Sequence, residues 1–287
     1  MATALFFHAH PDDEALSTGG TMLLASRAGH RVVLVCATDG SRGETPGLGG
    51  SESPTAEELA AIRAVELQAA ADLLGVHRLV MLGYGDSGMR DDPANEDPDC
   101  FWQADLDEAA GRLAAILTQE QADLITCYDS NGTYGHPDHV MVHRVGVRAA
   151  ELAGVGLVYE ATLHRDHFRD SMKELMRLAA EAGFDLSGDQ DQSEFEAELD
   201  EGSIGVEGAR VTHYIDVSAT LDRKRAAFRA HASQIPSDSF MVSLPDEAFQ
   251  LAFGTEWFIR RGQSAADPPA TDLFAALEAR SDPAPES

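Results

Sequence analysis

The sequence predicts an α/β fold with a doubly wound, mostly parallel sheet. Two observations carry this prediction. Up to about residue 165, short apolar runs alternate with longer segments of helical character, which is the rhythm of βαβ units. One of the runs, RVVLVCA at 31–37, is apolar at nearly every position, as expected of a parallel strand that is covered on both faces.

The expected elements follow one another in regular order. The segment at 55–74 carries the strongest helix signals, because Thr55 and Glu58 have the spacing of a capping box. Residues 38–54 and 86–103 are polar, lack periodicity and are predicted to be long loops. Apolar runs predict strands at 3–8, 31–37, 78–83, 124–128 and 157–163, and the segments between them predict helices at 16–27, 55–74, 106–119 and 137–152.

This alternation breaks after residue 163. The following segments predict helices at 166–182 and 221–232, a strand at 211–217 and a further apolar element at 240–259. We therefore expect a Rossmann-like domain at 1–165 and a smaller C-terminal α+β portion at 166–262, with an acidic loop at about 184–210. Residues 263–287 are rich in Ala, Pro and Asp and are expected to form a disordered tail.

The composition restricts the classes of partner and compartment. The chain has 287 residues, is 44% hydrophobic and carries a formal net charge of −28, which argues against a nucleic acid, because affinity for phosphates comes from Lys and Arg. The three cysteines lack paired spacing, and Cys36 and Cys127 are expected to be reduced core residues. No cationic and apolar leader and no run of membrane-spanning length is visible. We therefore predict a cytoplasmic protein without a membrane partner, and a homo-oligomer stays open.

Two short stretches have the same local design. HAHPDDE at 8–14 follows one apolar run, and GHPDH at 135–139 follows another. Each places a proline where a helix would start, since the first helical position does not need a backbone N–H. Both are therefore expected to be strand-to-helix junctions with titratable groups in the first turn. In an open α/β sheet such junctions lie at the carboxyl ends of strands, where ligands bind.

Together the two junctions can supply a metal site. Catalytic zinc takes three protein ligands from His, Asp or Glu and keeps one position for water. His10 and Asp13 are three residues apart across a helix start, and His139 lies one turn into the other helix. Asp12 would remain free as a general base, and His136 as an acid or as a donor to an oxyanion. One such stretch alone is more typical of a helix cap, but the pair favours one zinc, or another divalent ion, per chain.

The two motifs resemble those of the PIG-L-like, or LmbE-like, zinc-dependent N-deacetylases. The similarity rests on AHPDDE at 9–14 and on HPDH at 136–139. It extends over about residues 3–165 and is looser around 228–235, which reads FRAHASQI. The resemblance therefore implies that the domain at 1–165 is the catalytic domain and carries the metal site.

The resemblance also implies a role for each residue of the two motifs. The zinc ligands that it implies are His10, Asp13 and His139. Asp12 would be the general base, and His136 would stabilise the oxyanion or protonate the leaving amine. Asp138 would orient His136, whereas His8 and Glu14 are not ligands in the pattern of the family.

Three further positions match the branch of the family that acts on glucosaminyl-inositol. Glu44 lies in the glycine-rich loop after the second expected strand, Arg63 on the following helix, and Asp86 after the third strand. In that branch these positions hold substrate hydroxyls, and Tyr134 would help to hold the oxyanion. Ser41 stands where the loop of the family often has an acidic residue.

The resemblance implies a small glycoconjugate as substrate and leaves two activities open. One is removal of an acyl group, expected to be acetyl, from the amide nitrogen of a glucosamine-containing molecule of the mycothiol pathway. The other is hydrolysis of a mycothiol S-conjugate. A non-catalytic metal- or sugar-binding protein is disfavoured, because binding alone needs neither Asp12 nor His136. A nucleotide-binding Rossmann domain is excluded, since no GxGxxG motif follows the first strand.

Overall fold

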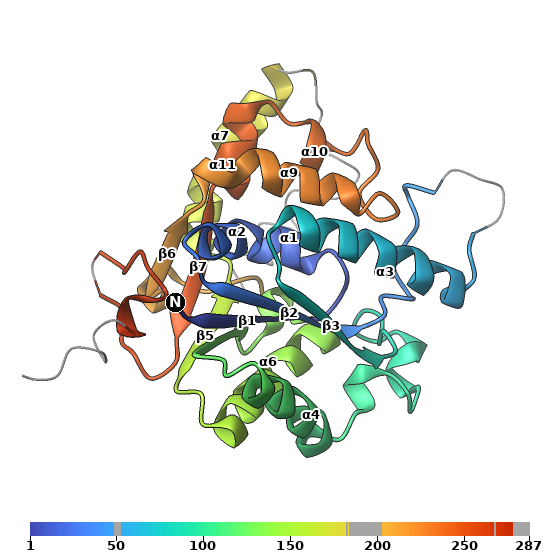
Figure 1. Ribbon diagram of the computed structural model, residues 1–287. Helices are drawn as coiled ribbons and strands as arrows, with labels where there is room; N and C mark the ends of the chain where they lie inside the picture. Colours follow the sequence, from blue (N-terminus) through green and yellow to red (C-terminus); the bar gives the residue numbers. More distant parts are fainter. Residues whose placement is uncertain (49–52, 182, 184–202, 267, 278–287) are drawn as a thin grey trace, which may run out of the picture.

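A seven-stranded sheet organises the fold (Figure 1). This computed structural model describes residues 1–48, 53–181, 183, 203–266 and 268–277. The strands are β1 Thr3–His8, β2 Arg31–Thr38, β3 Arg78–Tyr84, β4 Leu124–Tyr128, β5 Leu157–Thr162, β6 His213–Asp216 and β7 Thr255–Arg260. They lie in the order β3-β2-β1-β4-β5-β7-β6, which confirms the predicted α/β fold with a mostly parallel sheet.

The first five strands are parallel, and they are the five that the apolar runs predict. β1 lies between β2 and β4, and Phe6 and Phe7 of β1 are fully buried because helices cover both faces. β7 runs antiparallel to β5, and β6 runs antiparallel to β7. The predicted C-terminal portion therefore extends the same sheet at one edge.

Helices cover both faces of the sheet (Figure 1). One face carries α1 Asp13–Ser17, α2 Gly19–Arg27, α3 Ala56–Leu73 and, near the C-terminus, α9 Leu221–Ala230; the other carries α4 Leu106–Gln119 and α6 Pro137–Ala153. The other described α-helices are α5 Gly132–Gly135, α7 Arg165–Glu181, α10 Phe240–Ser243 and α11 Asp246–Phe253, and short 3-10 helices lie at Pro93–Glu96, Phe101–Gln103, Gly208–Arg210 and Ser218–Thr220. The capping box predicted for Thr55 and Glu58 is present at the start of α3.

Two of the predicted segments are divided into several elements in the structure. The helix predicted at 16–27 is two helices, because Thr18 leaves the helical conformation, with φ −141° and ψ 9°, between α1 and α2. α1 begins at Asp13, within the motif, so that Asp13 and Glu14 stand in its first turn. The apolar segment predicted at 240–259 contains α10, α11 and most of β7.

The predicted disordered tail packs on the fold around residues 270–277, whereas most of its other described residues are exposed. Leu273 is buried, and its carbonyl accepts a hydrogen bond from Tyr159 Oη. The Ala270 backbone bridges to His213, and Phe274 packs against the core. The tail prediction is wrong here because Leu273 and Phe274 have apolar side chains. Removing these side chains from water lowers the free energy of the folded protein.

The described end of the predicted acidic loop lies against α5. Residues 184–202, most of this loop, lie outside the described residues. Asn131 Nδ2 donates to Ser203 O, and Gly205 N–H donates to Thr133 O. The described end of the loop is thereby fixed beside the segment that leads into α6.

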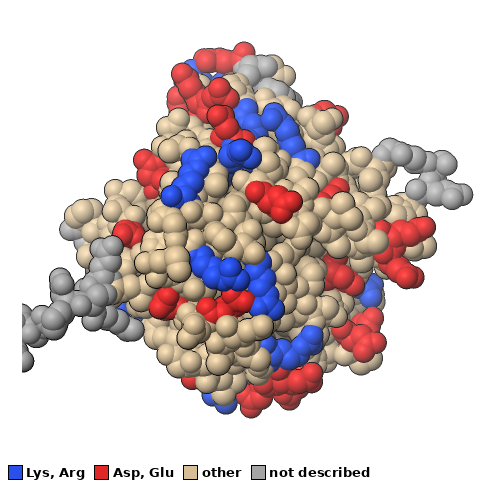
Figure 2. Space-filling view, viewed as in Figure 1, with Lys and Arg blue, Asp and Glu red and all other residues tan. Residues whose placement is uncertain are grey.

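The surface reflects the acidic composition. Acidic side chains form several groups on the face shown in Figure 2, with Lys and Arg side chains between them. No helix in the described part of the chain is long and apolar enough to cross a membrane.

The direction in which successive strands are added to the sheet reverses at β1. From β1 the chain adds β2 and β3 on one side, and then β4 and β5 on the other. The carboxyl ends of β1 and β4 therefore meet at a topological switch point, where open α/β sheets bind their ligands. Both junctions lie there, since residues 8–14 continue from the end of β1 and residues 129–139 follow β4.

Candidate metal centre and catalytic site

Three side chains predicted as metal ligands meet at this switch point. Asp13 Oδ2 lies 3.2 Å from His10 Nδ1 and 3.3 Å from His139 Nε2, and all three residues are buried. Two of them come from the junction after β1 and the third from the first turn of α6. The pairing of β1 with β4 therefore brings the two halves of the site together.

The donor atoms have spacing that suits a metal ion. Zinc–ligand bonds of about 2.0–2.1 Å in a tetrahedron place neighbouring ligand atoms roughly 3.3–3.4 Å apart. The two distances from Asp13 Oδ2, 3.2 Å and 3.3 Å, are close to that value. Asp13 Oδ2 is therefore placed as a neighbouring ligand of either histidine would be, although the groups of described donor atoms that all lie within 4.8 Å of one another do not include Asp13.

The electrostatics of the cluster also favour a cation. Burial acts to raise the pKa of Asp13, but His139 and His10 hold it well below its ordinary range, so the carboxylate is ionised. Burial acts to lower the pKa of His10, but its contacts with Asp13 and Asp138 and the nearby Asp86 raise it well above its ordinary value. The carboxylates around His10 thus stabilise positive charge, which a divalent ion would supply.

Further donor atoms surround His10. The donor atoms of His10, His136 and His139 all lie within 4.8 Å of one another. The same holds for a second set of donor atoms, which come from His10, Asp86, His136 and Asp138. In the second set, Asp138 already accepts hydrogen bonds from the N–H and Oγ–H of Ser87. The cluster can therefore hold a metal ion, and the set of His10, Asp13 and His139 stays the predicted one.

The Asp138 carboxylate supports His10 rather than His136. Its Oδ2 lies 3.0 Å from His10 Nε2. A histidine that binds a metal through one nitrogen commonly gives the other to a carboxylate, which fixes the ring. Asp138 is predicted to orient His136, but its carboxylate contacts His10 and Ser87, and His136 is the extended N-cap of α6. The backbone N–H of Asp138 orients that ring instead, by donating to His136 Nδ1.

His136 is a neutral hydrogen-bond donor in this geometry. Burial, with His10 and His139 nearby, lowers the pKa of His136 to about 4. The backbone N–H of Asp138 lies 3.1 Å from His136 Nδ1, which must be the acceptor. The proton of the neutral ring is therefore on Nε2, and this N–H can donate to a developing oxyanion without an additional proton.

Asp12 combines an unusual backbone with a buried charged partner. Its φ of 130° and ψ of −31° lie in a region that non-glycine residues seldom adopt. Its Oδ2 lies 3.1 Å from Arg63 Nη2. Burial raises the pKa of Asp12 to about 6, although Arg63 acts in the opposite direction. A carboxylate with a pKa near the working pH is suited to general base catalysis.

Arg63 is buried beneath Asp12. Its Nη1 donates to Gly40 O at 2.7 Å, and its Nη2 donates to Pro11 O at 2.6 Å. A Cβ atom at Gly40 would lie 2.7 Å from the guanidinium, which explains a glycine at this position. Arg63 Nε is buried and has no hydrogen-bond partner among the described residues. A contact of Arg63 with substrate hydroxyls, as the sequence predicts, would need Nε or an exchange of these partners.

The other predicted residues differ in their distance from the cluster. Asp86 is buried, and its Oδ1 lies 3.7 Å from His10 Nε2, so it stands beside the predicted ligands. Tyr134 is 44% exposed, and its Oη lies 3.5 Å from His139 Nε2, which places it between the cluster and solvent. Glu44 is exposed on the loop after β2, and its contact with a substrate stays a prediction.

The structure adds two residues for which the sequence motifs predict no role. Glu14 and His231 are fully buried, and Glu14 Oε1 lies 2.7 Å from His231 Nε2. Burial acts to lower the pKa of His231, but Glu14 raises it above its ordinary value. The looser motif at 228–235 was the signal that could have indicated His231. Both ring nitrogens of His8 lie 2.8 Å from protein hydroxyls, those of Tyr128 and Thr18.

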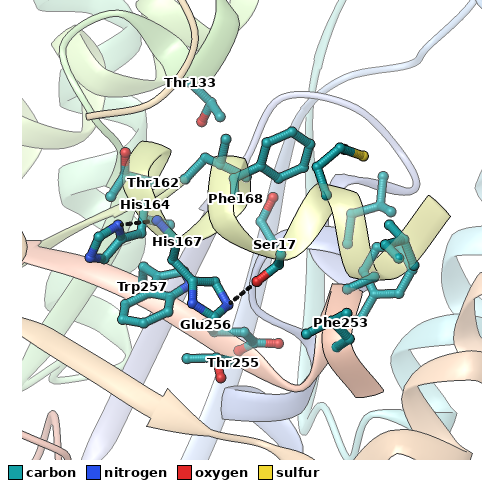
Figure 3. A pocket seen from close by; sticks show the side chains of 18 of the residues that line it. Ser17, Thr133, Thr162, His164, His167, Phe168, Phe253, Thr255, Glu256 and Trp257 are labelled. Atoms are coloured by element: carbon teal, nitrogen blue, oxygen red, sulfur yellow. Dashed lines mark hydrogen bonds between the residues drawn. The ribbon is translucent and has the colours of Figure 1, made fainter. Parts of the chain in front are cut away.

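An apolar cavity of about 390 Å³ is lined by residues of α1, α5, α7, α11 and β7, and none of the predicted metal ligands is among them (Figure 3). Figure 3 shows His164, His167 and Trp257 together at one end of it. Ser17 of α1 and Thr133 of α5 also line the cavity. α1 begins with the predicted ligand Asp13, and α5 contains Tyr134, whose Oη lies 3.5 Å from His139 Nε2.

The family follows from a comparison with known proteins. Residues 5–150, just over half of the chain, match the PIG-L family, which is described as GlcNAc-PI de-N-acetylase. The chain belongs to the PIG-L family. The resemblance predicted from the two motifs is thereby confirmed. So is the prediction of a hydrolase that acts on the amide of a glucosamine-containing small molecule.

Relatives within the PIG-L family cover almost the whole chain. A 1D-myo-inositol 2-acetamido-2-deoxy-alpha-D-glucopyranoside deacetylase of Acidothermus cellulolyticus is 41% identical, over 97% of this chain and 96% of its own. A protein with the same name from Geodermatophilus obscurus is 36% identical, over 95% and 97%. Among solved structures, the N,N'-diacetylchitobiose deacetylase of Pyrococcus horikoshii is 25% identical, with a TM-score of 0.52 over 83% of this chain and 72% of its own.

The first prediction concerns the metal content of this PIG-L protein. We expect about one divalent ion per purified chain, and His10→Ala or His139→Ala should reduce this to near zero, because each removes one of three predicted ligands. Elemental analysis of dialysed protein measures the content. His8→Asn is the matched control, since His8 is a buried histidine whose two nitrogens already bind hydroxyls. Full metal in both alanine variants would contradict the ligand set.

Proposed function

We propose that this protein is a zinc-dependent N-deacetylase that removes the acetyl group from 1D-myo-inositol 2-acetamido-2-deoxy-α-D-glucopyranoside. The observation that carries the proposal is the convergence of Asp13, His10 and His139, with the carboxylate of Asp12 left outside the ligand set and paired with Arg63. The relatives that cover almost the whole chain bear the name of this activity. Zinc as the ion, the cytoplasm as the location and a homo-oligomer as the assembly remain predictions.

The proposed metal ligands are His10, Asp13 and His139. Asp138 would orient the ring of His10 through the hydrogen bond between Asp138 Oδ2 and His10 Nε2. When bound, the ion supplies a Lewis acid for the amide carbonyl and for a water molecule. Three carboxylates beside His10 provide the negative charge that keeps such an ion in place.

Asp12 is the proposed general base. Its carboxylate is separate from the proposed ligands, and Arg63 holds one of its oxygens. With its pKa raised to about 6 by burial, the carboxylate is ionised at neutral pH and can take a proton from water. The protonated Asp12 can then return this proton to the nitrogen of the leaving amine, so that one side chain serves both halves of the reaction.

His136 and Tyr134 are the proposed donors to the oxyanion. His136 carries its proton on Nε2 because Nδ1 accepts the Asp138 N–H. Burial raises the pKa of Tyr134 far above its ordinary value, so its hydroxyl remains a donor throughout the working range of pH. Donors that are already in place stabilise developing charge without reorganisation, which is a large contribution to catalysis.

Groups around the cluster are proposed to select a polyhydroxylated substrate. Asp86 stands beside His10, and Glu44 is exposed on the neighbouring loop after β2. A site that hydrogen-bonds substrate hydroxyls rejects analogues without them, because its buried polar groups would lose their partners. The apolar cavity beside Thr133 favours the second candidate function, hydrolysis of an S-conjugate with an apolar substituent.

A substrate panel tests this proposal. We expect kcat/KM for the acetylated glucosaminyl-inositol to exceed that for free N-acetylglucosamine by about 10-fold or more, because the inositol adds hydroxyls to be recognised. Fluorescent detection of the released amine measures both, together with a mycothiol-type thioether, chito-oligosaccharides and acetylated peptides.

The panel also separates the alternatives. Preference for the thioether would identify an S-conjugate amidase. Hydrolysis of acetylated peptides without any activity on sugars would overturn the substrate assignment and leave the metal chemistry intact. Binding of sugar without amine release from any compound, by protein with its full metal content, would support a non-catalytic protein.

A further inference from the structure

A buried pair of side chains lies directly behind the backbone of Asp12. Glu14 Oε2 accepts a hydrogen bond from the Asp12 N–H at 2.9 Å. The other carboxylate oxygen, Glu14 Oε1, lies 2.7 Å from His231 Nε2. Both side chains of this pair are 0% exposed, so neither is available to contact a substrate.

The contact falls on a residue with an unusual backbone conformation. Asp12 has φ 130°, and such a conformation persists only where the surroundings determine it from several sides. Glu14 holds the N–H of Asp12, while Arg63 holds its Oδ2 and the carbonyl of Pro11. The carboxylate of Asp12 is therefore placed by bonds to its own backbone as well as to its side chain.

His231 also belongs to a segment that holds the second partner of Asp12. Ser233 N–H and Oγ donate to the two carboxylate oxygens of Glu66, at 2.7 Å and 2.6 Å. Glu66 stands on α3 three residues after Arg63, which is about one helical turn. Residues 231–233 thus connect Glu14 on one side of Asp12 with the helix of Arg63 on the other.

We propose that the hydrogen-bonded pair of Glu14 and His231 positions the Asp12 carboxylate for proton transfer. The proposal rests on the assignment of Asp12 as general base. A buried charged pair is a weak source of stability, since well-packed apolar residues often do better at the same place. Glu14 and His231 are therefore positioning residues, which act on the reaction through Asp12 and touch no reacting atom.

The experiment is a double-mutant cycle on the metal-loaded, full-length protein, with acetylated glucosaminyl-inositol as substrate. Glu14→Ala should lower kcat by about 10- to 100-fold, because a displacement of about 1 Å in a catalytic group has that effect. KM should stay within about threefold, and the metal content should not change. In an Asp12→Asn background, Glu14→Ala should lower the residual kcat less than about twofold, since both changes act through one carboxylate.

Conservative variants and a matched control separate positioning from folding. Glu14→Gln keeps an acceptor for the Asp12 N–H and should recover most of kcat. His231→Ala should lower kcat as Glu14→Ala does. If Glu14→Ala does not fold, His231→Ala takes its place in the double-mutant cycle with Asp12→Asn. His213→Gln is the control, because His213 is a buried histidine of the same C-terminal portion that bonds Thr212 instead, and its kcat should remain that of wild type.

Three results would overturn the inference. They are an unchanged kcat in a folded Glu14→Ala or His231→Ala variant, an equal loss in the wild-type and Asp12→Asn backgrounds, and loss of the metal from these variants. An Asp12→Asn variant with wild-type activity would instead overturn the proposed function itself, so the two failures are distinguishable.

Discussion

Replacing Asp12 by Asn should lower kcat/KM by about 10²–10⁴ while the metal content stays at the wild-type level. Asn has the shape of Asp and can still accept a hydrogen bond from Arg63, but it cannot take a proton from water at neutral pH. Steady-state kinetics and metal analysis on the same preparation check both parts of this expectation.

The neighbouring carboxylate supplies the control. Asp13→Ala should lose metal and activity together, because Asp13 Oδ2 faces both predicted histidine ligands. In the wild type, kcat/KM should fall as the pH drops through about 6, since Asp12 must be ionised to act as a base, and the residual activity of Asp12→Asn should lack this limb. Metal loss from Asp12→Asn with retention in Asp13→Ala would reverse the two assignments.

Truncation of His136 should lower kcat by about 10²–10³, the usual effect of removing one oxyanion donor. KM should change little, because the donor acts on charge that develops only in the transition state. Single-turnover and steady-state measurements of His136→Ala, with substrate at saturation, test this expectation.

The metal content of the same variant decides between two roles of His136. Its donor atom lies within 4.8 Å of those of His10 and His139, so the ring is close enough to be a ligand. A full metal content in His136→Ala would agree with a donor, and an empty site would make His136 a ligand. His136→Gln keeps an N–H group and should recover part of the activity if the role is donation.

Local signals were sufficient to predict the positions of the two His-Pro junctions. The apolar runs before residues 8–14 and 135–139 predicted strands, and proline at the first helical position predicted the start of α6. Parallel pairing then brings the two junctions together, so the meeting of Asp13 with His139 followed from pattern and fold class.

Contacts between distant parts of the chain could not be predicted in this way. The family resemblance implies a substrate contact for Arg63, and the helical pattern at 55–74 does not show that its side chain turns inward to Asp12. His231 is 217 residues from Glu14, and no periodicity indicates that α9 ends beside α1. The break at Thr18 was missed because residues 16–27 have the composition of one continuous helix.

On the proposed role of Asp12 as general base, its backbone conformation lowers the thermal stability of the protein at a residue that the reaction requires. A non-glycine residue at φ 130° costs on the order of 1–3 kcal/mol, a considerable fraction of the stability of a domain. Asp12→Gly would relieve this cost, because glycine adopts positive φ readily, and it would also delete the carboxylate. A search for thermostable variants that screens folding alone would therefore favour inactive protein at this position, and such a search should keep residue 12 fixed.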